Sequence, residues 1–228
     1  MTLKHSGAAA ILGGLALLAV GTAAQATAGW EFTSAGNNFT NGQWDFATAF
    51  TANRNTTVSG LGYYADPVTG NADSNAVALY QCDDAACLTT GTLLATATVT
   101  NIYALNGHFR YVTIGAVNLV AGQSYEVAGV SNQDHYTWND PGFAVNSDIT
   151  FLTTSGQASR WRHGTTPDFL IGSGSIDLGG QDGYWGPNIF LGLPVFTGTP
   201  EPTTWAMMLL GVGGLGVALR ARRKTAVA

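Results

Sequence analysis

The sequence predicts an all-β fold, a single antiparallel β-sandwich of Greek-key or jelly-roll type. Two observations lead to this prediction. No window of the central region repeats apolar residues at the helical period of about 3.6 residues. Short runs rich in Val, Thr, Tyr and Phe recur instead, separated by clusters of Gly, Asn and Asp. Many short strands at this spacing are typical of sandwiches and barrels. A signal peptide is expected before the sandwich and a transmembrane helix after it.

The central domain is expected to cover residues 27–197, with strands in two groups. The clearest strands are 45–52, 56–65, 76–81, 92–100, 109–114 and 124–130. A second group follows at 149–153, 158–162, 169–171 and 188–191. The stretch 132–183 is richer in polar residues, so long loops are expected there.

Residues 1–26 have the layout of a secretory signal peptide. Lys4 and His5 precede an apolar stretch at 8–20, and Ala24-Gln25-Ala26 supplies the small residues of a cleavage site, with Ala26-Thr27-Ala28 as a second choice. The alternative is a membrane helix, but an apolar stretch of this length covers only about 20 Å of a bilayer core of about 30 Å. The mature chain is therefore expected to begin near Thr27.

The other end, residues 198–228, predicts a membrane helix followed by a basic tail. The segment 203–219 contains no charge and would reach about 25 Å as a helix, with Trp205 at the outer interface. Four positive charges follow directly, at Arg220, Arg222, Arg223 and Lys224. The positive-inside rule keeps that end cytoplasmic, so the preceding domain lies outside.

Pro200-Glu201-Pro202 stands immediately before this helix. Two prolines hold the backbone extended and keep the tripeptide accessible at the membrane surface. The order of Pro-Glu-Pro, Gly-rich apolar helix and Arg cluster resembles the PEP-CTERM sorting signal of Gram-negative bacteria. Thr199 and Thr203 depart from it, because the family often has Val and Ala there.

The resemblance implies recognition by an exosortase after export through the secretion machinery. It further implies that the tail anchors the protein in the membrane only until it is removed, and that the product reaches the cell envelope or extracellular matrix. The alternative is a permanent single-span anchor, which the glycines of this helix would weaken.

Charge excludes one class of partner. Residues 27–200 contain four arginines, no lysine and thirteen acidic residues, a net charge of −9. Nucleic-acid binding depends on Lys and Arg that displace counterions from phosphates. Nucleic acid is therefore not expected as a partner.

The stretch from Leu119 through Gly122 to Tyr125 has the spacing of a tyrosine corner. In that motif a Tyr at the start of a strand hydrogen-bonds backbone a few residues upstream and holds a Greek-key crossing. The alternative is an ordinary turn before a strand.

Several apolar strand motifs carry a second resemblance. They occur in fixed order at residues 60–64, 77–80, 92–95 and 109–112, followed by Tyr125 and by 184–188. Over residues 30–192 the chain is similar to an uncharacterised sandwich domain common among PEP-CTERM proteins. That family assigns no catalytic residues, so none is implied here.

Cys82 and Cys87 are the only cysteines. They lie between two expected strands, outside the cytoplasm, where disulfides persist, and a bond between them is expected. A metal site is the alternative, but two cysteines need further ligands and no paired His motif lies nearby. No metal and no cofactor are expected.

The sequence contains no nucleophile elbow, no His-Glu-x-x-His and no phosphate loop. A non-enzymatic structural or polysaccharide-binding domain, with exopolysaccharide as its partner, is therefore expected. The alternative is a secreted hydrolase, for which two or three of His135, His163, Asp140 and Asp168 should converge in one cleft.

Three further binding sites are considered. Tyr136, Trp138, Trp161, Tyr184 and Trp185 could form an aromatic face for sugars, although buried core aromatics would give the same pattern. Asp66, Asn71 and Asp73 could hold calcium, although they also suit a plain turn. Thr96, Thr98 and Thr100 align on one strand face as on ice-binding surfaces, although ordinary polar-out alternation explains them.

Overall fold

The computed structural model describes residues 26–67, 70–71, 73–152, 159–171 and 183–193. The expected signal peptide and the expected sorting tail at 198–228 lie outside these residues. Every regular element in the described part of the chain is a β-strand, so the all-β prediction is confirmed there. The same part contains no helix with the length and apolar character needed to cross a membrane.

The long strands come from the first group of predicted runs. They are β4 (Trp44–Ala52), β5 (Thr56–Tyr64), β6 (Asn75–Cys82), β7 (Gly91–Val99), β9 (Phe109–Leu119) and β10 (Ser124–Val130). Three shorter strands follow, β13 (Ile149–Phe151), β14 (Ser159–His163) and β15 (Pro187–Leu191). The remaining strands are β1 (Thr27–Ala28), β2 (Trp30–Glu31), β3 (Asn37–Phe39), β8 (Leu105–Asn106), β11 (Tyr136–Trp138) and β12 (Ala144–Val145).

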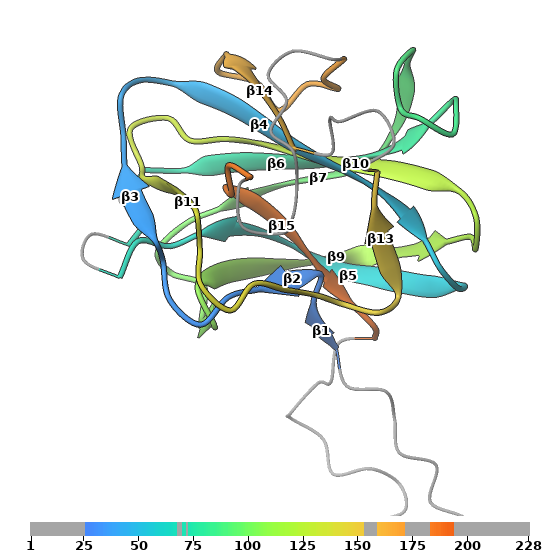
Figure 1. Cartoon of the computed structure of the whole chain (residues 1–228), viewed down its shortest axis with the longest axis horizontal. Coiled ribbons are helices and arrows are strands. Elements are labelled where there is room, and N and C mark those ends of the chain that lie inside the picture. Colours follow the sequence, from blue (N-terminus) through green and yellow to red (C-terminus); the bar gives the residue numbers. More distant parts are fainter. Residues whose placement is uncertain (1–25, 68–69, 72, 153–158, 172–182, 194–228) are drawn as a thin grey trace, which may run out of the picture.

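Two main sheets organise the described residues. One has the order β1-β15-β5-β9-β8, and the other has the order β13-β4-β10-β6-β7, with β14 on β4 as well. All pairings are antiparallel, and β13 and β14 pair with successive parts of β4. The pairs β3–β11 and β2–β12 complete the fold. Figure 1 shows both sheets curled and the ends of β1 and β15 at the bottom of the molecule.

One apolar core lies between the two sheets. Alternate residues of each strand face inward, as the period of two in a strand requires. The second sheet contributes Phe50, Leu79 and Val127, and the first contributes Leu61 and Ile189, all buried in one cluster. The core thus joins strands that are distant in the chain.

One predicted strand, 169–171, is wrong. Leu170 is buried but its backbone N–H donates to the Glu126 carboxylate at 2.7 Å, and its carbonyl accepts from Arg160 at 2.6 Å. Side chains therefore satisfy the backbone groups that a neighbouring strand would otherwise pair.

The tyrosine corner is confirmed. Tyr125 is the second residue of β10 and has 1% of its surface exposed, and its hydroxyl accepts a hydrogen bond from the Val120 N–H at 2.8 Å. Gly122 has a φ of 80° in the turn between them, which glycine adopts at little cost. The corner thereby connects β9 of one sheet to β10 of the other.

The Cys82–Cys87 disulfide is also confirmed, with the two Cα atoms 5.0 Å apart. The loop that it closes packs on the outer face of the second sheet. There the Arg160 guanidinium donates to the Cys87 carbonyl at 2.6 Å and to the Glu126 carboxylate at 2.5 Å. Burial raises the pKa of Glu126 to about 7, although the Arg160 charge opposes that rise. Arg160 and Glu126 are fully buried, so this ion pair fastens the loop to the sheet.

Candidate functional site: an aromatic pocket

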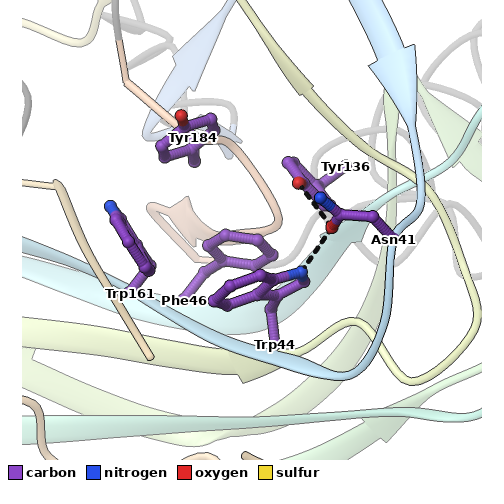
Figure 2. Close-up of a pocket in the computed structure, with 6 residues that line it drawn as sticks. All are labelled: Asn41, Trp44, Phe46, Tyr136, Trp161 and Tyr184. Atoms are coloured by element: carbon purple, nitrogen blue, oxygen red, sulfur yellow. Dashed lines mark hydrogen bonds between the residues drawn. The ribbon is translucent and has the colours of Figure 1, made fainter. Parts of the chain in front are cut away.

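A pocket of about 220 Å³ opens at the end of the domain opposite β1 and the last residues of β15. Its lining residues come in part from the start of β4, from β11 and from β14, and Figure 1 shows the start of β4 and β14 toward the top of the view. Five aromatic side chains and one amide line it: Asn41, Trp44, Phe46, Tyr136, Trp161 and Tyr184. Figure 2 shows Phe46 and Trp44 side by side, with Trp161 and Tyr136 on opposite sides of them and Tyr184 beyond.

The pairing of β4 with β14 places one half of the pocket. Phe46 pairs with Trp161, and Trp44 pairs with His163. Opposed residues of an antiparallel pair point to the same face, so these four rings gather on one side. Because Phe50 lies four residues after Phe46 and points into the core, this side is the inner face of the sheet.

Aromatic contacts connect the rings, with Phe46 tilted by 31° to Trp44 and by 37° to Tyr184, and with three other pairs at steep angles. Trp161 lies 5.2 Å from Trp44 at 82° and 6.2 Å from Tyr184 at 89°, measured between ring centroids and planes. Tyr136 lies 5.7 Å from Tyr184 at 82°. Edge-to-face pairs of this kind are favourable, so the walls of the pocket support one another.

Asn41 ties two walls together. Its Oδ1 accepts a hydrogen bond from Trp44 Nε1 at 2.6 Å and another from the Tyr136 hydroxyl at 3.0 Å. Burial raises the pKa of Tyr136 to about 12, so the hydroxyl stays protonated and donates. His163 stacks on Trp44 with centroids 3.7 Å apart and steadies it further.

The pocket is uncharged. None of the six described residues that line it carries a formal charge, and Trp44, Trp161 and Tyr184 are half-buried. Flat apolar rings with a few hydroxyl, amide and indole groups can hold a ligand that has both apolar C–H faces and hydroxyl groups.

The structure brings together only part of the predicted aromatic face. Tyr136, Trp161 and Tyr184 line the pocket, and half-buried Trp138 lies outside the lining with its ring 6.4 Å from Tyr184. Trp185 is a core residue instead, with none of its surface exposed, packed on Trp30, Phe143 and Phe151. Its predicted place on the sugar-binding face is therefore wrong, and its role is structural.

The prediction missed Asn41, Trp44 and Phe46. A signal for two of them exists in the sequence, because Trp44 and Phe46 alternate around Asp45 and so share a strand face. Asn41 has no comparable signal, since its role depends on Tyr136, which lies far along the chain.

The residues considered for calcium point to separate partners. Asp66 Oδ2 lies 3.3 Å from His135 Nδ1, and the Asn71 amide donates to Asn75 Oδ1 at 2.9 Å. Asp73 accepts from the Gln133 N–H at 2.9 Å. In the described part of the chain, no three His, Cys, Asp or Glu side chains lie close enough to hold a metal ion.

The residues considered for a hydrolase also have different surroundings. His163 stacks on Trp44, and Asp168 pairs with Arg162. His135 lies beside Asp66, and Asp140 accepts from the Gly36 N–H at 2.6 Å and from Thr137 at 2.7 Å.

The threonine face that resembles an ice-binding surface is exposed at Thr96 and Thr98, while Val99 of the same strand is buried.

Comparison with known protein families identifies two regions of the chain. A family model described as "Domain of unknown function (DUF4082)" matches residues 33–173, and the chain belongs to that family. A second model, described as the PEP-CTERM protein-sorting motif, matches residues 199–224. A search of curated proteins finds no match. Both resemblances seen in the sequence are confirmed, and the sorting motif marks an exported, envelope-associated protein that an exosortase processes.

Proposed function

We propose that the domain is a non-enzymatic binding module of the envelope or extracellular matrix, which holds exopolysaccharide in its aromatic pocket. In this proposal the two curled sheets form one Greek-key sandwich, and the predicted helix at 203–219 anchors the protein until exosortase removes the tail. The observation that carries the proposal is the pocket itself, an uncharged set of five rings that is partly open to solvent.

The position of the pocket supports this role. Thr27 pairs with Leu191, so the described chain begins and ends at one edge of the domain. Trp44 and Phe46 of the pocket lie at the start of β4, which Figure 1 shows at the end of the domain away from β1. A polymer bound there would meet the domain on the side away from its membrane attachment.

Substitution of Trp161 tests the proposal. Trp161→Leu keeps an apolar side chain but removes the flat ring, so polysaccharide binding should weaken by about tenfold or more, equivalent to about 1.4 kcal/mol. Trp161→Phe keeps a flat ring and should retain most of the binding. Binding is measured on a glycan array and by co-sedimentation with exopolysaccharide from the native host.

Thermal unfolding of the two variants serves as the control for folding. Equal binding by the Leu and Phe variants would contradict the proposal, because a flat ring would then make no difference. Turnover of the polysaccharide by the parent protein would show that the domain is a hydrolase instead.

A further inference from the structure

We infer that the pocket takes a single, uncharged sugar residue at a chain end or branch tip, rather than a run of residues within a polysaccharide chain. This inference rests on the proposed function and narrows it to one class of ligand. Size, ring geometry and charge each support it.

The first support is size. Pockets for drug-sized ligands generally measure about 300 to 1,000 Å³. At about 220 Å³ this pocket is smaller. It therefore suits one ring-sized group, and neighbouring sugars of a chain would have to lie outside it.

The second support is the angle between the rings. A polymer that runs across a protein needs aromatic rings arranged in a line as a flat platform. Here Trp161 stands at 82° to Trp44 and at 89° to Tyr184. Phe46 is tilted by only 31° to Trp44, but Trp161 stands across both Trp44 and Tyr184, so the rings form no single flat platform. The Trp161 ring would obstruct a chain that continued on both sides of the bound residue.

The third support is charge. The lining holds no cation that could pair with a carboxylate, and the region 27–200 has a net charge of −9. An anionic residue such as a uronate would be repelled and would lose solvation without gaining a partner. An uncharged residue incurs neither penalty.

Two polar groups remain to orient such a residue. Asn41 is exposed, and its amide N–H groups donate to none of the described residues, because both of its hydrogen bonds there use Oδ1. The half-buried Tyr184 likewise makes no hydrogen bond through its hydroxyl within the described part of the chain. Both groups are therefore available to sugar hydroxyls at the rim.

Counting chain ends tests the inference whichever sugar the polymer carries. The full-length protein is kept in a polyoxyethylene detergent, which has neither a sugar nor a choline headgroup. Exopolysaccharide from the native host is immobilised, and soluble competitors are the same polymer intact or cut by mild acid to raise the number of ends at constant mass. Competition should rise in proportion to the ends, so that a tenfold rise in ends lowers the required mass about tenfold.

A panel of methyl glycosides then identifies the residue. Neutral hexosides or N-acetylhexosaminides should compete, and uronides should not. Trp161→Leu should abolish the dependence on ends, while Trp161→Phe should keep it.

The outcomes separate this inference from the proposed function. Competition that falls as the polymer is shortened, or a preference for uronides, would overturn end binding while polysaccharide binding survives. Failure of the intact polymer to bind at all would overturn both. Displacement of the polymer by choline would also overturn the inference, since it would show a cage for organic cations instead.

Discussion

Asp45 is the most unusual charged residue of the described chain. It lies between Trp44 and Phe46 but points to the opposite face of β4, where it is fully buried. Its Oδ2 lies 3.4 Å from Arg162 and accepts from the Asp168 N–H at 3.2 Å, while Oδ1 finds no donor among the described residues. Burial therefore raises the pKa of Asp45 from 3.8 to about 8, even though the Asp168 N–H and Arg162 favour the charged form.

This raised pKa predicts that the domain loses stability as pH rises. Between the unfolded pKa of 3.8 and the folded pKa of about 8, the native state holds a proton that the unfolded state releases. The free energy of unfolding should then fall by up to about 1.4 kcal/mol per pH unit from this one group. The contribution is complete below pH 4 and lost above pH 8.

Asp45→Asn should remove that part of the slope, because the amide does not titrate. Urea unfolding of parent and variant at pH 5, 6.5 and 8 measures it, and Asp83→Asn at an exposed position controls for the lost charge. Glu126, with its pKa raised to about 7, should leave a similar slope in both proteins. If the free energy of unfolding depends on pH in the same way in the parent and in Asp45→Asn, folding does not raise the pKa of Asp45.

At the scale of elements, the turn between β9 and β10 depends on Tyr125. The ring packs in the core beside Phe50, with centroids 5.9 Å apart, and the hydroxyl holds the Val120 N–H. Tyr125→Phe keeps the ring but leaves that N–H without its partner, so it should cost about 1 to 3 kcal/mol of unfolding free energy. Tyr125→Ala also leaves a cavity and should cost about 3 to 5 kcal/mol.

Denaturant titration measures both losses. Tyr184→Phe is the matched control, because the Tyr184 hydroxyl makes no hydrogen bond within the described residues. This substitution should lower the free energy of unfolding by less than about 0.5 kcal/mol. If Tyr125→Phe costs no more than this control, the hydrogen bond to Val120 does not support the turn.

Sequence patterns predicted the long strands because runs of β-forming residues between turn residues mark them locally. In β7 the residues also alternate, since Ala95, Ala97 and Val99 pack on the core and Thr96 and Thr98 between them are exposed. The two-residue strands β1 and β8 are too short for a period to show. The strand predicted at Leu170 is wrong because an apolar residue in a loop can be buried as deeply as one in a strand. Here the side chains of Arg160 and Glu126 bind the backbone of Leu170 and hold that loop in place.

The candidate site was predictable only in part, for a related reason. Local alternation can place Trp44 beside Phe46 on one strand face. It cannot bring Tyr136 and Trp161 to them, because that requires the register of β14 on β4 and the position of β11. Tyr184 and Trp185 are neighbours in the chain, and the sequence does not say which of the two side chains reaches the pocket. A shift of one residue exchanges them, so only the strand register shows that Tyr184 lines the pocket and Trp185 lies in the core.

At the scale of the whole molecule, the chain combines a sorting motif with a β-domain. The motif at 199–224 directs export and processing, while β1 and β15 bring both ends of the described domain to one edge. The sequence predicted the sorting motif, because its three parts, Pro-Glu-Pro, the apolar segment and the Arg cluster, are contiguous in the chain. It could not predict that the pocket lies at the other end, which depends on how distant strands pair.

The final prediction concerns the sorting motif, and within it Pro200-Glu201-Pro202. If this tripeptide is the recognition element, replacing all three residues by alanine should block processing, since the extended backbone and the carboxylate are both lost. The full-length protein should then accumulate in the inner membrane of the native host. Immunoblots of inner-membrane, envelope and culture fractions measure this, with alanine replacement of Leu193-Pro194-Val195 as the matched control. That control removes a nearby proline but leaves the motif, so it should be processed as the parent is. Release of a shortened product from the Pro-Glu-Pro variant at the parental rate would show that the helix and the Arg cluster suffice for sorting.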